Sequence, residues 1–93
     1  MSQPSEFPPI PDWAQPVLQA PQAMIDGSAI LAEGGSPLDD ALAAADGLAR
    51  GEGFILRAPF DPAPLRGMLE QMGLLTVATP WTDGHWRTFV LRP

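Results

Sequence analysis

The chain has 93 residues, no cysteine and a formal net charge of −6 at pH 7. This length allows one small domain with a modest core. The absence of cysteine excludes disulfides, thiolate metal sites, persulfide carriers and cysteine nucleophiles. Because phosphate binding needs many cationic contacts, a chain with five arginines and no lysine is a poor candidate for binding nucleic acid or anionic membranes.

The charges are unevenly distributed along the chain. Residues 1–46 carry seven carboxylates and no basic side chain, whereas residues 47–93 carry five arginines against four carboxylates. No run of about 18 apolar residues is present, and the first residues lack the positive segment of a signal peptide. We therefore expect a cytoplasmic protein that binds neither membrane nor nucleic acid.

The first 21 residues differ in composition from the rest. Six of the twelve prolines lie there, and proline restricts both its own backbone and that of the preceding residue. The sequence thus predicts a proline-rich, partly disordered arm at 1–21 and an α/β domain at 22–93. Phe7, Ile10 and Trp13 are apolar, so the alternative to a disordered tail is an arm laid across the domain or a partner, with Trp13 as its anchor.

The domain is expected to begin with a strand within residues 24–33, followed by a helix. Ser36 suits the N-cap of that helix, Pro37 its first position and Gly51 its C-terminal cap. Between these residues, leucine and alanine recur at the 3.6-residue spacing of a helix with one apolar face. The pattern indicates a strand joined to the next strand by a helical crossover.

The second half repeats this order and adds a hairpin. Asp61 suits the N-cap of a second helix, which Gly73 ends, and Asp83-Gly84 is a strong hairpin turn. The remaining strands are expected at residues 54–58, 74–79 and 85–92. The resulting order, β-α-β-α-β-β, predicts an α+β two-layer sandwich with both helices on one face of the sheet.

Three segments of the chain resemble a known family. They are Gly51-Glu52, the run Phe60-Asp61-Pro62-Ala63-Pro64-Leu65, and Trp86-Arg87 with Leu91. In this order they are similar to domain-of-unknown-function family 2249, small bacterial domains related to the TusA/SirA-like sulfur carriers. Over residues 25–92, the resemblance implies a mixed four-stranded sheet of order 1-2-4-3, with the last strand antiparallel to the others.

The resemblance implies the fold and not sulfur transfer. Sulfur carriers have Cys-Pro-x-Pro at the start of the first helix, where this chain has Ser36-Pro37-Leu38-Asp39. A serine hydroxyl cannot carry a persulfide. Members of the family often occur near hemerythrin-like and nitrogen-oxide metabolism genes, an association that names no mechanism.

Catalytic and metal-binding interpretations find little support in the sequence. Ser36 as a nucleophile would need His85, the single histidine, as its base, whereas a helix cap explains the same serine. His85 as a metal ligand would need two or three partners, and only Asp83 is close in sequence. We expect no cofactor and no metal.

The helix-free face of the sheet is the strongest candidate for binding. Alternation along the strands at 54–58 and 85–92 can place one set of side chains there: Ile55, Arg57, Arg87, Phe89 and Leu91. A partly apolar patch of this kind usually marks an interface. The arm, a second copy, another protein and a small anionic ligand remain open as occupants, and so does the opposite orientation of strand 85–92, because both its faces are apolar.

The sequence favours a non-catalytic binding or accessory domain. It would contact a protein partner, or form a homodimer, through the open sheet face. The candidate binding residues are Arg57, Arg87, Phe89, Trp13 and His85. The alternative is a small-anion-binding protein or enzyme related to sulfur or nitrogen-oxide metabolism, acting through Ser36, Arg57 and His85.

Overall fold

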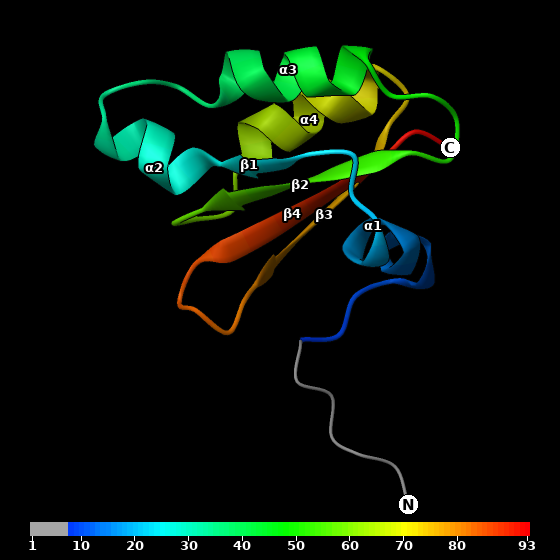
Figure 1. Cartoon of the computed structure of the whole chain (residues 1–93), viewed down its shortest axis with the longest axis horizontal. Helices are drawn as coiled ribbons and strands as arrows, with labels where there is room; N and C mark the ends of the chain where they lie inside the picture. The colour runs from blue at the N-terminus through cyan, green and yellow to red at the C-terminus, as the bar shows by residue number, and fades with distance from the viewer. Residues whose placement is uncertain (1–7) are drawn as a thin grey trace, which may run out of the picture.

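A mixed four-stranded sheet with the order β1-β2-β4-β3 forms the centre of the molecule (Figure 1). The structure, a computed structural model, describes residues 8–93. The strands are β1 Met24–Asp26, β2 Gly53–Ala58, β3 Leu75–Pro80 and β4 Trp86–Leu91. β1 is parallel to β2, and β4 is antiparallel to both β2 and β3. The expected α+β fold and strand order are confirmed.

Two helices cover one face of this sheet, α3 (Leu38–Asp46) and α4 (Ala63–Gln71) (Figure 1). The larger core lies between them and the sheet. Its buried members are Ala41, Ala45, Leu48, Phe54, Leu56, Leu65, Leu69, Leu74 and Val90. Thr88 is buried on the same face, and its hydroxyl has no hydrogen-bond partner within residues 8–93.

The first strand is shorter than the sequence predicts. It ends at Asp26, and residues Gly27–Ala32 form helix α2, so the strand expected within 24–33 is wrong beyond its third residue. The Asp26 carboxylate accepts the backbone N–H of Ala29 at 3.1 Å and so caps α2. Gly27 has no room for a side chain, because a Cβ there would lie 2.7 Å from the Arg57 carbonyl oxygen.

Two helix boundaries also differ from the prediction. Helix α3 ends at Asp46 with Gly47 as its C-cap, whereas Gly51, at φ +83°, lies in the turn before β2. Helix α4 has Pro62 at its N-cap position, and Asp61 makes no capping hydrogen bond. The Asp61 carboxylate instead accepts two bonds of 2.9 Å from the Arg66 guanidinium, a bidentate pair that replaces the cap.

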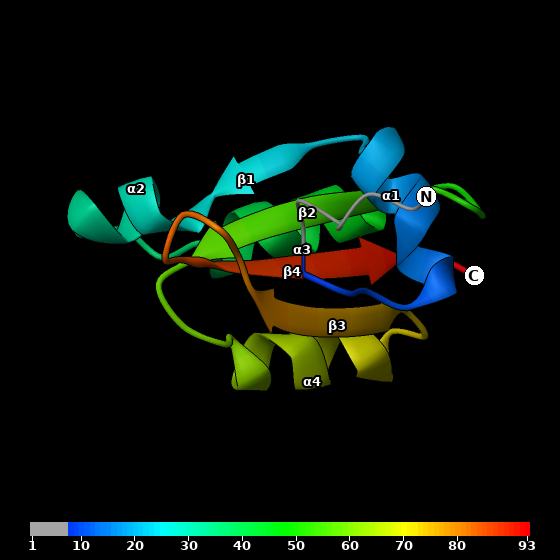
Figure 2. The ribbon, with the colours of Figure 1, turned by 90° about the horizontal axis from the view of Figure 1, so that it is seen from below.

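The arm packs on the other face of the sheet. It forms a 3-10 turn, η1 (Asp12–Ala14), and helix α1 (Gln15–Gln19), which lies across one end of β2 and β4 (Figure 2). Ala14 and Val17 are buried there. Gly53 permits this approach, since a Cβ at that position would lie 2.6 Å from Val17 Cγ2. The face predicted to be free of helices is therefore partly covered by the chain itself.

Part of the arm prediction lies outside the described residues, namely residues 1–7 with Phe7. Within residues 8–93, no helix has the length and apolar character needed to cross a membrane.

Candidate functional site

Two arginines predicted to share a face form a network with two aspartates beside the turn between β3 and β4. Arg57 and Arg87 are direct partners in the β2–β4 pairing. Arg57 donates to Asp26 and to Asp83 at 3.1 Å each, and Arg87 donates to Asp83 at 2.8 Å. We refer to Asp26, Arg57, Asp83 and Arg87 as the Arg–Asp cluster. Its two positive and two negative charges balance.

The partners also shift the pKa values of the cluster. Hydrogen bonds from Arg87, and then from the backbone N–H of His85, hold the pKa of Asp83 well below its usual range. The backbone N–H of Ala29, followed by Arg57, lowers the pKa of Asp26. The two carboxylates raise the pKa of Arg57. An anionic ligand would have to displace these carboxylates, so the cluster is poorly suited to bind one.

The lowered pKa of Asp83 predicts how stability depends on pH. A carboxyl whose pKa is lower in the folded state contributes stability above its unfolded pKa of about 4 and loses it as the pH falls further. We expect Asp83→Asn to lower the free energy of unfolding at pH 7 and to flatten its decline below about pH 4. Urea unfolding at a series of pH values measures this. Parallel curves for the two proteins would contradict it.

His85 lies next to the cluster and forms a hydrogen bond with a serine that the sequence analysis did not single out. Its Nδ1 is 2.8 Å from Ser28 Oγ, and its backbone N–H donates to Asp83 at 3.0 Å. Ser36, the serine considered as a nucleophile, is not its partner. Within residues 8–93, no group of three or more histidines and carboxylates could hold a metal ion.

Phe89 of β4 and Trp13 of the arm belong to the same apolar cluster. Phe89 is fully buried against Ala14, Val17 and Ile55, and Trp13 packs at the edge of this second core. Of the occupants that the sequence left open for this face, the arm is the one that covers Phe89. A partner or a second copy could reach Phe89 only by displacing α1.

A small hollow remains where the arm meets the open part of this face. Its volume is about 200 Å³. Arg87 and the Trp81 and Phe89 rings belong to its lining, with the guanidinium 5.9 Å from the Trp81 centroid. The two rings are 5.7 Å apart. Since Arg87 already holds Asp83, the hollow offers an aromatic wall and little uncompensated charge.

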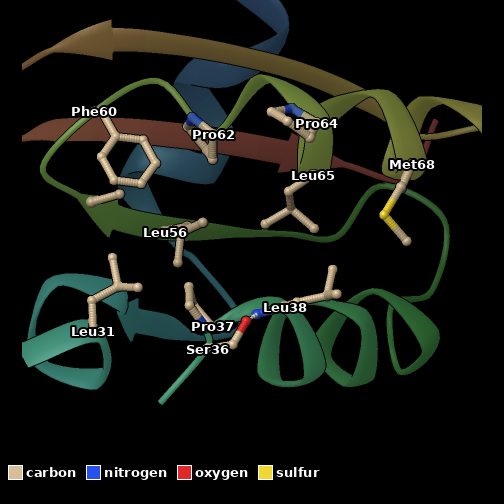
Figure 3. Close-up of a pocket in the computed structure, with 11 residues that line it drawn as sticks. Leu31, Ser36, Pro37, Leu38, Leu56, Phe60, Pro62, Pro64, Leu65 and Met68 are labelled. Atoms are coloured by element: carbon tan, nitrogen blue, oxygen red, sulfur yellow. Dashed lines mark hydrogen bonds between the residues drawn. The ribbon is translucent and has the colours of Figure 1, made fainter. Parts of the chain in front are cut away.

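A larger pocket opens on the opposite side, at the end of the helix-covered face (Figure 3). Its volume is about 290 Å³. Leu56 of β2 lies between two walls, which Figure 3 shows facing each other. One wall comes from α2 and the start of α3, and the other from the segment before α4 and from α4 itself. The apolar side chains of the walls are Leu31, Pro37, Leu38, Phe60, Pro62, Pro64, Leu65 and Met68.

Three of these wall residues are exposed although they are large and apolar. Phe60 is 53%, Met68 43% and Leu31 37% accessible. The sequence did not indicate that any of these three residues lies at the surface. The signal was weak, because Phe60 follows a strand and reads equally well as its buried continuation. We call this site the apolar pocket.

Ser36 lines the apolar pocket and forms a hydrogen bond with the first turn of α3. Its Oγ accepts the backbone N–H of Leu38 at 3.3 Å, while the Pro37 carbonyl accepts the first helical hydrogen bond from Ala41. The cap position itself is therefore Pro37, one residue after the predicted one. The serine supports the first turn, and no base contacts it within residues 8–93.

Comparison with models of protein families finds no match for this chain. Searches of curated proteins and of solved structures likewise find no match.

Proposed function

We propose that this chain is a non-catalytic binding domain that acts through protein contacts made by the apolar pocket. The observation that carries the proposal is the exposure of Leu31, Phe60 and Met68 around one hollow. Folding alone gives no reason to gather large apolar side chains at the surface. Concave apolar surface of this kind is typical of a site where a partner is bound.

The open shape of the pocket favours a protein partner over a free small molecule, whereas its volume lies at the lower limit for either. Ligand pockets usually span about 300 to 1,000 Å³ and bury most of their ligand. At about 290 Å³ and open to solvent, this pocket suits one or two anchoring side chains of a partner. Such buried anchors supply much of the affinity of protein interfaces.

The polar groups of the molecule give less support to catalysis. Arg57 and Arg87 are engaged with aspartates, and His85 contacts Ser28 outside both hollows. His85 lines neither hollow, so a substrate bound in either one would not contact its imidazole. We also propose that the chain is related to domain family 2249, whose implied strand order is the same. The proposal does not include sulfur transfer, because Ser36 stands where the sulfur carriers have cysteine.

Selection from a random peptide library on the full chain tests the proposal. We expect the enriched peptides to share a large apolar residue and to bind Phe60→Ser more than about tenfold more weakly, as for loss of an interface anchor. Met24→Ser is the matched control, because Met24 is 59% exposed and lies outside the apolar pocket. Enriched peptides that bind Phe60→Ser and Met24→Ser equally well would refute the proposal.

A further inference from the structure

Uncompensated negative charge lies close in sequence to the α2–α3 wall of the apolar pocket, whose own lining there is Leu31, Ser36, Pro37 and Leu38. Glu33 follows Leu31 by two residues, and Asp39 and Asp40 follow Leu38 directly. All three carboxylates are exposed, and none forms an ion pair within residues 8–93. Two of them lie in the first turn of α3, where the helix dipole stabilises them.

The opposite wall is electrically different. Asp61 pairs with Arg66 at 2.9 Å, and Glu70 lies 4.0 Å from the same guanidinium. Arg66 therefore compensates much of the negative charge on that side. Unpaired carboxylates therefore flank the α2–α3 wall, whereas the carboxylates near the opposite wall share a cation. We expect the surface potential near the mouth of the pocket to be more negative on the α2–α3 side.

We propose that the apolar pocket docks a cationic amphipathic segment of a partner protein. One or two large apolar side chains would insert between Leu31, Phe60 and Met68, and lysine or arginine side chains of the same segment would face the unpaired carboxylates. This inference rests on the proposed function and specifies its partner. Complementary charge of this kind chiefly sets partner choice and the rate of association.

The same charges argue against other occupants. Anionic ligands, including fatty-acid carboxylates and phosphate groups, would meet the negative wall. A second copy of this chain would bring its own charge of −6. Three of its five arginines, Arg57, Arg66 and Arg87, are already in ion pairs. A different, basic protein segment is the occupant that satisfies both the apolar lining and the charge.

Two labelled peptides of about 14 residues test this inference, with leucine at every third or fourth position and either lysine or glutamate at the remaining ones. Fluorescence anisotropy measures their affinity for the full chain at low and physiological salt. We expect the lysine peptide to bind more than about tenfold more tightly than the glutamate peptide, with a difference that shrinks as salt rises.

Paired variants locate the charge effect. Asp39→Asn with Asp40→Asn should weaken binding of the lysine peptide about threefold to tenfold, a range typical of two partly screened ion pairs. Asp12→Asn with Asp46→Asn makes the same change in net charge and should alter it less than about twofold, because neither residue lies within two positions of a residue that lines the pocket, whereas Asp39 and Asp40 follow Leu38. Equal effects of the two pairs would overturn the inference, since non-specific attraction would then explain the binding.

Phe60→Ser separates this inference from the proposed function. If both peptides bind equally and both lose affinity in Phe60→Ser, the cationic partner is ruled out and the apolar pocket still binds protein segments. If neither peptide binds, or if binding is unchanged in Phe60→Ser, the inference fails together with the role of the pocket. Circular dichroism of each variant confirms that the chain is folded.

Discussion

Phe89→Ala is expected to lower the free energy of unfolding by about 3 to 5 kcal/mol, the usual cost of removing a buried phenylalanine ring. Phe89 is completely buried, and its ring lies between β4 and the arm, in contact with Val17 and Ile55. Truncation would leave a cavity between the sheet and the arm, in the centre of the cluster that joins them. Urea unfolding followed by circular dichroism measures the change.

Phe60→Ala is the matched control, because it removes the same ring from an exposed position. Phe60 is 53% accessible, so we expect a change within about 0.5 kcal/mol. The two variants thus separate a ring that holds the fold together from one that is available to a partner. Similar losses of stability in the two variants would mean that the arm does not cover Phe89 as the structure describes.

The sheet was predictable because its signals are local. Short apolar runs indicate β2 and β4, and Asp83-Gly84 predicts the antiparallel hairpin of β3 and β4. The position of β4 beside β2 was implied by the family resemblance. Alternation allowed Arg57 and Arg87 to share a face but left the opposite orientation of β4 open, and in the structure they are strand partners. Their ion pairs with Asp83 were not predicted, because a turn residue's direction depends on the backbone of the whole hairpin.

The first strand was overextended because a short apolar run fits a strand or a helix equally well. Ile25, Ile30 and Leu31 gave no period, and the deciding signal was Asp26 before Gly27, a helix cap next to a glycine that must approach the Arg57 carbonyl. That close approach is a tertiary contact. Sequence alone could not distinguish it from a flexible position within a strand.

The apolar pocket lay beyond sequence reasoning for a similar reason. Its walls come from segments that are distant in the chain, Leu31 on α2 and Phe60 before α4, and each reads as ordinary core by itself.

The arm was only half predictable. Its apolar residues indicated that it covers something, but the docking position depends on Gly53, which contributes no side chain to any pattern.

Val17→Asp is expected to detach the arm from the sheet. Val17 is 2% accessible and touches the face formed by Ile55 and Phe89, where a carboxylate would have no partner. Leaving an unpaired charge buried costs several kcal/mol, about as much as a short docked segment contributes, so undocking relieves it. Fast amide exchange in α1, with protection retained in β2 and β4, would report this state.

The control is Gln19→Asp, which places the same charge on an exposed position of the same helix and should leave the arm in place.

Once α1 leaves, Ile55 and Phe89 become an exposed apolar patch beside the balanced charges of the Arg–Asp cluster. Such a patch promotes self-association, so Val17→Asp should show a larger mass in light scattering as concentration rises, and Gln19→Asp should not. If Val17→Asp remains monomeric with α1 protected, the arm is not the cover of this face. If it associates, the arm is what keeps the sheet face from acting as an interface between copies of the chain.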